Sequence, residues 1–264
     1  LGGLAAALEL AARDLDVLLL ERAAAPGGKL RTLRVGDVDV DAGPTVLTMR
    51  WVFEGLFAAA GTSLDAALEL VPATTLARHA WRRGGRLDLY ADVERSAEAI
   101  GDFAGAAEAR GYLDFCARSA AIYRSLREPF ISSSRPTLVD LVRRVGLRRL
   151  DELWNLGSMQ SMWKALGRHF RDPRLRQLFA RYATYVGSSP LTAPSTLMLV
   201  AHVEQDGVWM IRGGMQRLVE ALRQAVAARG ARLRFGCEVE SLRVARGRIA
   251  GVTLADGERL DADA

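Results

Sequence analysis

Few side chains in this chain of 264 residues can bind a metal ion or form a disulfide. The sequence has two cysteines, Cys116 and Cys237, and three widely separated histidines. This set cannot provide the ligand spacing of a zinc site, so no metal centre is predicted. Two distant cysteines favour inert thiols in a reducing compartment, with a Cys116–Cys237 disulfide as the alternative.

Long apolar stretches are also missing. The longest segment without a charged residue, 182–201, is interrupted by Gly187, Pro190 and Pro194. A membrane-spanning helix needs about 20 predominantly apolar residues without such breaks. The sequence therefore predicts no transmembrane helix.

Lysine is nearly absent. Lys29 and Lys164 are the only two, so the net charge of +5 rests on arginine. A composition rich in Arg and Ala indicates a GC-rich genome rather than a nucleic-acid-binding surface, and no nucleic-acid partner is expected. Because the chain starts at Leu1 without a methionine and stops within a strand-like pattern, we expect an internal piece of a longer protein.

Both ends of the chain have α/β patterns. Residues Gly2 to Ala12 are small and apolar, and the run from Leu15 to Leu20 is typical of a buried parallel strand. Near the other end, regularly spaced apolar residues over 215–226 predict an amphipathic helix. Strands are predicted after it, from about residues 231, 239 and 249.

The middle of the chain has a helical pattern. A hairpin is predicted over 76–91 and helices from about 95 to 181. Aromatic residues gather between Trp154 and Tyr185, which indicates a large apolar interior or a pocket. We therefore predict an α/β fold, α+β overall, in which a mostly helical domain interrupts a Rossmann-like domain. The three segments are 1–70, 71–205 and 206–264.

The N-terminal helix and strand have the features of a dinucleotide site. Such a fold places glycines in the turn before its first helix, and an acid about 20 residues later that binds the ribose. Gly3 matches the last of these glycines, Gly2 is adjacent to it, and Glu21 matches the acid. The alternative is a plain helix–strand pair of any α/β protein.

A diglycine segment follows this strand. Pro26–Gly27–Gly28–Lys29–Leu30–Arg31–Thr32 resembles the motif of FAD-dependent oxidoreductases of the amine-oxidase and glutathione-reductase-like type. Two residues without side chains let the backbone approach a cofactor, and Lys29 stands where these families usually have arginine. A surface loop without function is the alternative.

A second glycine segment narrows the resemblance. Asp39–Val40–Asp41–Ala42–Gly43–Pro44–Thr45 resembles a segment of the carotenoid (phytoene) desaturase family, and the likeness spans nearly the whole chain. Within that family, the chain is most similar to the hydroxyneurosporene or methoxyneurosporene dehydrogenase branch. These are 1-hydroxycarotenoid 3,4-desaturases of purple photosynthetic bacteria. The stretches that carry this similarity are Thr45–Phe57, Ala77–Trp81 and His169–Gly187.

The resemblance implies FAD as the cofactor and a set of residues that bind it. These are Gly2, Gly3, Glu21, Arg22, Gly27, Gly28, Lys29, Arg31, Gly43, Pro44, Thr45 and Val239. Gly2 and Gly3 are expected at the pyrophosphate and Glu21 at the adenosine ribose. Gly43 to Thr45 are expected near the flavin ring. For Val239, expected beside the adenine, an ordinary strand residue is the alternative.

The implied reaction removes two hydrogens from an acyclic carotenoid by hydride transfer from an allylic C–H bond to flavin. It needs an apolar tunnel rather than an acid–base pair, and no catalytic residue is named. His202 and Glu204, expected to follow an apolar strand, are candidates to face the site, with a structural histidine as the alternative. Other possible functions are a phytoene desaturase or isomerase, an amine-oxidase-like flavoenzyme, and FAD binding without turnover.

A lipophilic carotenoid substrate also implies contact with a membrane. Residues 138–154 combine Leu and Val with four arginines, a pattern that can lie in an anionic lipid interface. An ordinary helix with one buried face is the alternative. We expect a cytoplasmic protein associated with the inner face of the cell membrane, of unknown oligomeric state.

Overall fold

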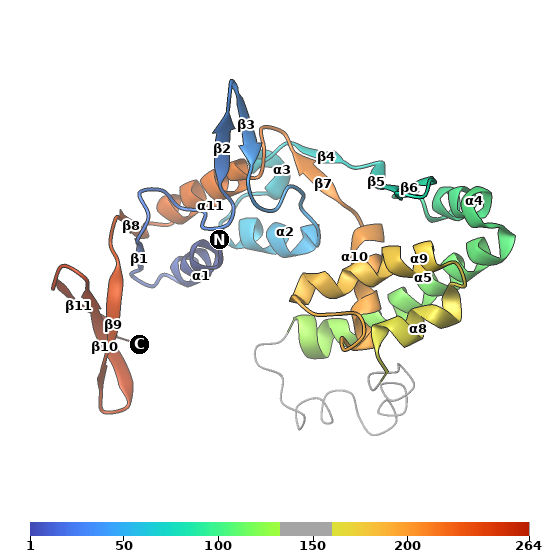
Figure 1. Cartoon of the computed structure of the whole chain (residues 1–264). Coiled ribbons are helices and arrows are strands. Elements are labelled where there is room, and N and C mark those ends of the chain that lie inside the picture. Colours follow the sequence, from blue (N-terminus) through green and yellow to red (C-terminus); the bar gives the residue numbers. More distant parts are fainter. Residues whose placement is uncertain (133–159, 264) are drawn as a thin grey trace. The chain divides into compact units, whose positions relative to one another are not determined.

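The computed structural model describes residues 1–132 and 160–263 (Figure 1). The chain forms two compact units, called unit 1 and unit 2. Unit 1 combines Leu1–Val71 with Trp209–Ala264, and unit 2 is the continuous segment Pro72–Val208. The sequence of unit 2 therefore interrupts that of unit 1.

Unit 1 draws its helices and strands from both ends of the chain. Its helices are α1 (Gly2–Ala11), α2 (Arg50–Ala59), α3 (Leu64–Ala67) and α11 (Gln216–Ala228). Its strands are β1 (Leu18–Glu21), β2 (Thr32–Val35), β3 (Val38–Asp41), β4 (Leu70–Pro72), β7 (Trp209–Ile211), β8 (Arg232–Phe235), β9 (Val239–Ala245), β10 (Arg248–Leu254) and β11 (Arg259–Asp261). The predicted α/β class is confirmed.

The first strand and the strand after α11 pair in parallel, with Glu21 opposite Phe235 at the end of the pair. α1 packs closely on this pair because Gly3 has no side chain. A Cβ atom on Gly3 would lie 3.3 Å from Cδ1 of Leu19 in β1. This close approach of helix and strand is the kind that the third glycine of a dinucleotide turn permits.

The first strand starts three residues later than the sequence pattern predicts. Asp14 adopts a left-handed conformation (φ 60°) that turns the chain after α1, and Leu15 is 54% exposed. The prediction from apolar residues alone therefore started the strand too early.

α1 and α11, from opposite ends of the chain, pack against each other (Figure 1). Their buried side chains form most of the core of unit 1. The residues with no more than 3% exposure on these two helices are Leu4, Ala7, Leu8, Ala11, Leu218, Val219, Leu222 and Val226. α11 confirms the amphipathic helix predicted over 215–226.

Two antiparallel sheets complete unit 1. β2 and β3 form a hairpin, and β9, β10 and β11 form a three-stranded meander. Turns occur at Arg246–Gly247 and at Gly257, where these residues have positive φ angles. β4 pairs with β7, a contact that the sequence pattern did not indicate.

Unit 2 has a hairpin followed by helices. The hairpin strands are β5 (Thr75–Ala80) and β6 (Arg86–Tyr90). The α-helices are α4 (Val93–Ala104), α5 (Ala106–Leu126), α8 (Met162–His169), α9 (Pro173–Ala180) and α10 (Leu199–Gln205). Irregular turns are η1 (Arg127–Ile131), η2 (Arg181–Val186) and η3 (Ser195–Met198). The predicted hairpin and helical region are confirmed in the described residues.

Aromatic side chains form the centre of unit 2. The rings of Phe170 and Phe179 stack with centroids 4.7 Å apart, and Phe115 lies 4.8 Å from Phe179. All three are at most 2% exposed, so these rings fill a core. Trp154 and the arginine-rich segment 138–154 lie outside the described residues.

One expectation about unit 2 was wrong. His202 and Glu204 do not follow a strand, because the apolar residues before them belong to helix α10. A short apolar run fits a buried helix as well as a strand, and its periodicity cannot separate the two. In the described parts of the chain, no helix is long and apolar enough to cross a membrane.

Candidate cofactor site

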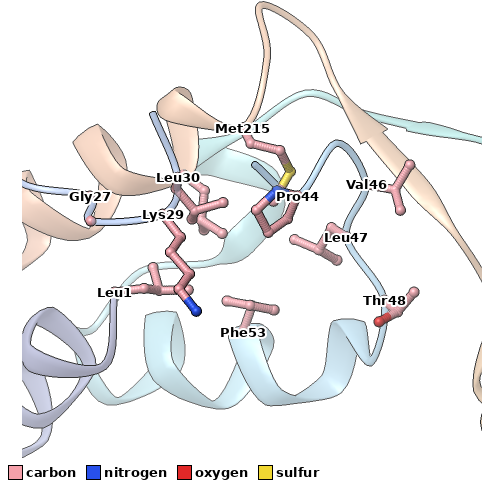
Figure 2. A pocket seen from close by; sticks show the side chains of 12 residues that line it. Leu1, Gly27, Lys29, Leu30, Pro44, Val46, Leu47, Thr48, Phe53 and Met215 are labelled. Carbon is pink, nitrogen blue, oxygen red and sulfur yellow. The ribbon is translucent and has the colours of Figure 1, made fainter. Parts of the chain in front are cut away.

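Unit 1 contains a cavity of about 440 Å³, which we call the loop cavity (Figure 2). Its lining residues are Leu1, Gly27, Gly28, Lys29, Leu30, Pro44, Val46, Leu47, Thr48, Phe53, Met215 and Leu218. Gly27, Gly28, Lys29 and Pro44 are among the residues predicted to bind a cofactor. The fold therefore brings the two glycine segments of the sequence to one cavity.

The diglycine loop turns sharply at its two glycines. Gly27 (φ 131°) and Gly28 (φ 62°) have backbone conformations that residues with a Cβ atom rarely adopt. The N–H of Leu30 donates to the carbonyl of Gly27 (3.1 Å) and closes the turn. A Cβ atom on Gly28 would meet no atom within 4 Å, so the backbone here borders open space.

The second glycine segment packs directly on the first. The N–H of Ala42 donates to the carbonyl of Arg31 (2.8 Å). A Cβ atom on Gly43 would collide with the carbonyl oxygen of Lys29. Gly43 thus allows the two loops to pack in contact, and Pro44 next to it lines the cavity. Gly43 itself is not a lining residue.

The start of α11 reaches the same cavity. Both carboxylate oxygens of Asp41 accept the backbone N–H of Met215, at 3.2 and 3.0 Å. A carboxylate at a helix N-terminus is favoured by the helix dipole and satisfies an N–H that has no partner within the helix. This contact fixes Met215 at the cavity wall.

Of the described residues that line the loop cavity, only Lys29 carries a charge. Its side chain extends toward Leu1 and Phe53 (Figure 2). Leu1 precedes α1, whose first turn has no side-chain cap and no acidic residue. An ammonium group and a helix N-terminus at one cavity favour an anionic ligand such as a phosphate.

A second predicted group lies at the carboxyl end of the parallel strands. Oε1 of Glu21 accepts the N–H of Ala23 (2.9 Å), which holds the carboxylate beside the strand end. The carbonyl of Glu21 accepts the N–H of Cys237 (3.0 Å), in the segment that leads to Val239. Val239 is 39% exposed and pairs with Leu254 at the start of the meander. Ligands of open α/β sheets bind at this edge.

The remaining predicted residues do not line the loop cavity. Gly2 and Gly3 form the first turn of α1. Arg22, Arg31 and Thr45 are exposed. The structure thus places four of the predicted residues at the cavity, two in the first turn of α1 and two at the strand ends.

Apolar residues that were not predicted as site residues complete the cavity. Leu47 and Trp209 exchange two backbone hydrogen bonds (2.8 and 2.9 Å), and Phe53 contributes from α2. Leu47 and Met215 do follow the glycine motifs in the sequence. Their side chains carry no chemical signature, so only the folded geometry identifies them as lining residues.

These residues fit FAD. At Gly28 there is room for a group to approach the backbone, and the ammonium of Lys29 and the positive end of the α1 dipole favour phosphates. Oε1 of Gln216 is buried without a hydrogen-bond partner among the described residues and lies 3.4 Å from the Cβ position of Gly27. This acceptor is free to receive a donor from a bound ligand.

Comparison with known proteins agrees with this geometry. Residues 1–264 match the family described as flavin containing amine oxidoreductase. The chain is 53% identical over its full length to hydroxyneurosporene desaturase of Rubrivivax gelatinosus, and 45% identical to the enzyme of the same name from Cereibacter sphaeroides. It spans 50% and 53% of the lengths of these relatives.

Solved structures show the same fold. The crystal structure of an oxidoreductase from Methanosarcina mazei matches all of this chain with a TM-score of 0.60 at 17% identity. The chain covers 55% of that structure. Since the family match includes every residue, the chain belongs to the flavin-containing amine oxidoreductase family, and FAD is its cofactor.

Proposed function

We propose that the protein carrying this chain is an FAD-dependent desaturase of an acyclic carotenoid with a hydroxyl group at carbon 1. The observation that carries this proposal is the 53% identity, over every residue of the chain, to a hydroxyneurosporene desaturase. The chain spans half of that relative, so the reaction is assigned to the complete protein.

In this proposal the residues of unit 1 hold the cofactor. Gly27 and Gly28 let the backbone approach it, Lys29 binds a phosphate, and Glu21 accepts hydrogen bonds from the ribose. Pro44 and the apolar cavity residues lie beside the flavin ring. Gly2, Gly3, Arg22, Arg31, Gly43, Thr45 and Val239 belong to the same proposed set. When bound, FAD accepts the hydride that leaves the substrate.

The protein's own part in such a reaction is to orient an apolar chain and exclude water. Unit 2 is the proposed substrate-binding segment, with a core dominated by aromatic and aliphatic side chains. As the double bond forms, a hydride leaves one carbon and a proton leaves the adjacent carbon, so the reaction would also need a proton acceptor, a role to which no described residue is assigned.

A lipophilic substrate is most available from a membrane. We therefore include in the proposal a location at the inner face of the cell membrane, with peripheral contact. The arginine-rich segment 138–154 is the candidate for this contact.

Expression of the complete protein in a bacterium that accumulates 1-hydroxyneurosporene tests the function. We expect a product with a longer conjugated system, detected by its red-shifted absorption and its loss of two mass units per desaturation. Conversion of phytoene but not of 1-hydroxyneurosporene would instead indicate a phytoene desaturase. Oxidation of amines would indicate an amine oxidase, and a flavin spectrum without any product would indicate a binding protein.

A further inference from the structure

The loop cavity contains a hydroxyl group to which the proposed function gives no role. Among the described residues that line the cavity, Lys29 and Thr48 are the two with a nitrogen or oxygen atom in the side chain. Figure 2 shows these two residues on opposite sides of the cavity. The cavity therefore has one charged and one neutral hydrogen-bonding group, separated by apolar side chains.

The hydroxyl of Thr48 is available to a ligand. The residue is half-buried, and its hydroxyl makes no hydrogen bond with any residue in the ranges 1–132 and 160–263. A threonine hydroxyl can donate one hydrogen bond and also accept from a donor. Thr48 can therefore pair with either kind of polar atom on a molecule that enters the cavity.

The backbone is anchored on both sides of Thr48. Before it, Leu47 is 2% exposed and exchanges its two backbone hydrogen bonds with Trp209. After it, Arg50 is the first residue of α2, and its Nη2 donates to the carboxylate of Asp65 in α3 (2.5 Å). A side chain between two anchored positions is pre-organised, so binding a ligand there costs little ordering.

The residue that follows Thr48 has a strained backbone. Met49 adopts a left-handed conformation (φ 50°, ψ 48°) where α2 begins. Residues with a Cβ atom rarely adopt this conformation, and such strain concentrates at binding sites, where the surrounding structure enforces it. Residues on both sides of this turn, Thr48 and Phe53, line the cavity, so the strained turn shapes the cavity wall.

The two polar side chains suit different parts of FAD. The ammonium group of Lys29 matches the charged phosphates. The part of the wall that includes Thr48 is otherwise apolar, with Val46, Leu47 and Phe53 as lining residues. An apolar wall with a single hydroxyl group suits a ring system with apolar faces and a hydrogen-bonding edge. In FAD, the flavin ring has this character and the phosphates do not.

We propose that the hydroxyl group of Thr48 forms a hydrogen bond with a nitrogen or oxygen atom of the flavin ring. Thr48 thereby contributes to the affinity for FAD and to the electronic state of the ring. This inference rests on the proposed position of the flavin ring at the loop cavity. It names a residue outside the set that the sequence implied, and it does not depend on which substrate is oxidised.

The test measures binding of FAD to the complete protein after removal of its cofactor. Thr48→Val removes the hydroxyl and keeps the branched shape of the side chain. We expect it to raise the Kd for FAD about three- to tenfold and to shift the visible absorption band of the bound flavin. Thr48→Ser keeps a hydroxyl and should resemble the wild type in both measurements.

Competition by ADP separates the flavin contact from the phosphate contact. ADP carries the phosphates of the cofactor without its flavin, and its Ki is measured against FAD binding. Thr48→Val should leave this Ki within about twofold of the wild type, whereas Lys29→Gln should raise it about tenfold. The two variants therefore affect different parts of the same ligand.

Thr62→Val is the matched control. Thr62 is an exposed threonine of unit 1 that follows α2 and does not line the loop cavity. This variant should leave the Kd for FAD and the flavin spectrum unchanged. The denaturation midpoints of the Thr48→Val and Thr62→Val apoproteins should both match that of the wild type.

Four results would overturn the inference. They are an unchanged Kd in Thr48→Val, a weaker Kd with an unchanged flavin spectrum, an equal loss for FAD and ADP, and a lower denaturation midpoint of the Thr48→Val apoprotein. All four leave the proposed function standing, because that function is judged by the product formed from 1-hydroxyneurosporene. A wild-type protein that forms no such product, yet shows the expected Thr48→Val effects, would overturn the function and keep the inference.

Discussion

The carboxylate of Asp41 accepts a hydrogen bond from the backbone N–H of Met215, which lies 174 positions later in the sequence. Asp41 ends the hairpin β2–β3, and Met215 precedes α11. Gly214 permits this contact, since a Cβ atom there would lie 3.1 Å from Oδ1 of Asp41. One carboxylate therefore joins the N-terminal and C-terminal segments of unit 1 at the wall of the loop cavity.

Replacing this carboxylate should destabilise unit 1. We expect Asp41→Ala to lower the free energy of unfolding by about 1–2 kcal/mol, the usual cost of losing a helix cap. The control is Asp39→Ala, because Asp39 makes an exposed ion pair with Arg34 (3.1 Å) that is worth less than about 1 kcal/mol. Denaturant titration measures both, and equal effects would contradict the capping role.

The ammonium group of Lys29 should contribute to FAD affinity. Lys29→Gln removes the charge from the loop cavity, and we expect a roughly tenfold weaker Kd for FAD, with Lys29→Arg close to the wild type. Lys164→Gln serves as the control, since Lys164 is the only other lysine and is exposed on α8 in unit 2. Titration of apoprotein with FAD by fluorescence quenching gives the affinities. A Lys29→Gln variant with unchanged Kd would exclude a phosphate contact.

Two glycines of the site should respond differently to alanine. Gly43→Ala places a Cβ atom against the carbonyl of Lys29, so we expect a loss of stability of several kcal/mol or failure to fold. Gly28→Ala faces open space, and its positive φ angle costs only about 1–2 kcal/mol. We expect Gly28→Ala to fold and to bind FAD more weakly. Thermal melts of the two variants that coincide would contradict this difference.

Acid should destabilise unit 2 through its histidines. Burial is the main cause that lowers the pKa of His79, His169 and His202 in the folded protein. In the unfolded chain a histidine has a pKa of about 6.5, so below that pH the unfolded state binds more protons than the folded state. The contribution of these neutral histidines to the free energy of unfolding is therefore fully present above pH of about 6.5, and it is lost as the pH falls through their lower pKa values in the folded protein. Denaturation midpoints at pH of about 7.5 and 5.5 test this. His169→Gln should reduce the difference, and an unchanged difference in this variant would show that His169 does not contribute.

The two thiols should differ in reactivity. Cys116 is buried, Nε2 of Gln205 lies 2.8 Å from its sulfur, and burial raises the pKa of its thiol to about 11. Cys237 is partly exposed in unit 1. We expect a maleimide to label only Cys237 in the native protein and both residues after unfolding, as measured by mass spectrometry. Rapid native labelling of a Cys237→Ser variant would contradict this assignment.

The elements with local signals could be predicted from the sequence. Asp172 and Pro173 start α9, because the aspartate side chain accepts the N–H of Arg174 (2.8 Å) and proline suits a first helical turn. The hairpin turn at Gly84 and Gly85 was equally predictable, since both have positive φ angles. In each case the determining residues are neighbours in the sequence.

The contacts that build the candidate sites could not be predicted in this way. Each of these contacts joins residues that are not neighbours in the chain. They are the pairing of β4 with β7, the hydrogen bond from the N–H of Met215 to Asp41, and the hydrogen bond from Arg181 to Glu204. Glu204 was noticed in the sequence but placed after a strand, since its apolar neighbours fit either structure. The glycine motifs predicted a cofactor site, and only the folded structure identified the apolar residues that line the loop cavity around them.

The parallel pairing of β1 with β8 also has a consequence for the order of folding. Leu18–Glu21 leaves the ribosome more than 200 residues before its partner Arg232–Phe235, whereas unit 2 is continuous from Pro72 to Val208. Contacts of such long sequence separation form slowly, and domains synthesised as one piece fold first. During translation, α1 and β1 therefore expose an apolar face until α11 and β8 have been synthesised, and an exposed apolar face of this kind favours aggregation.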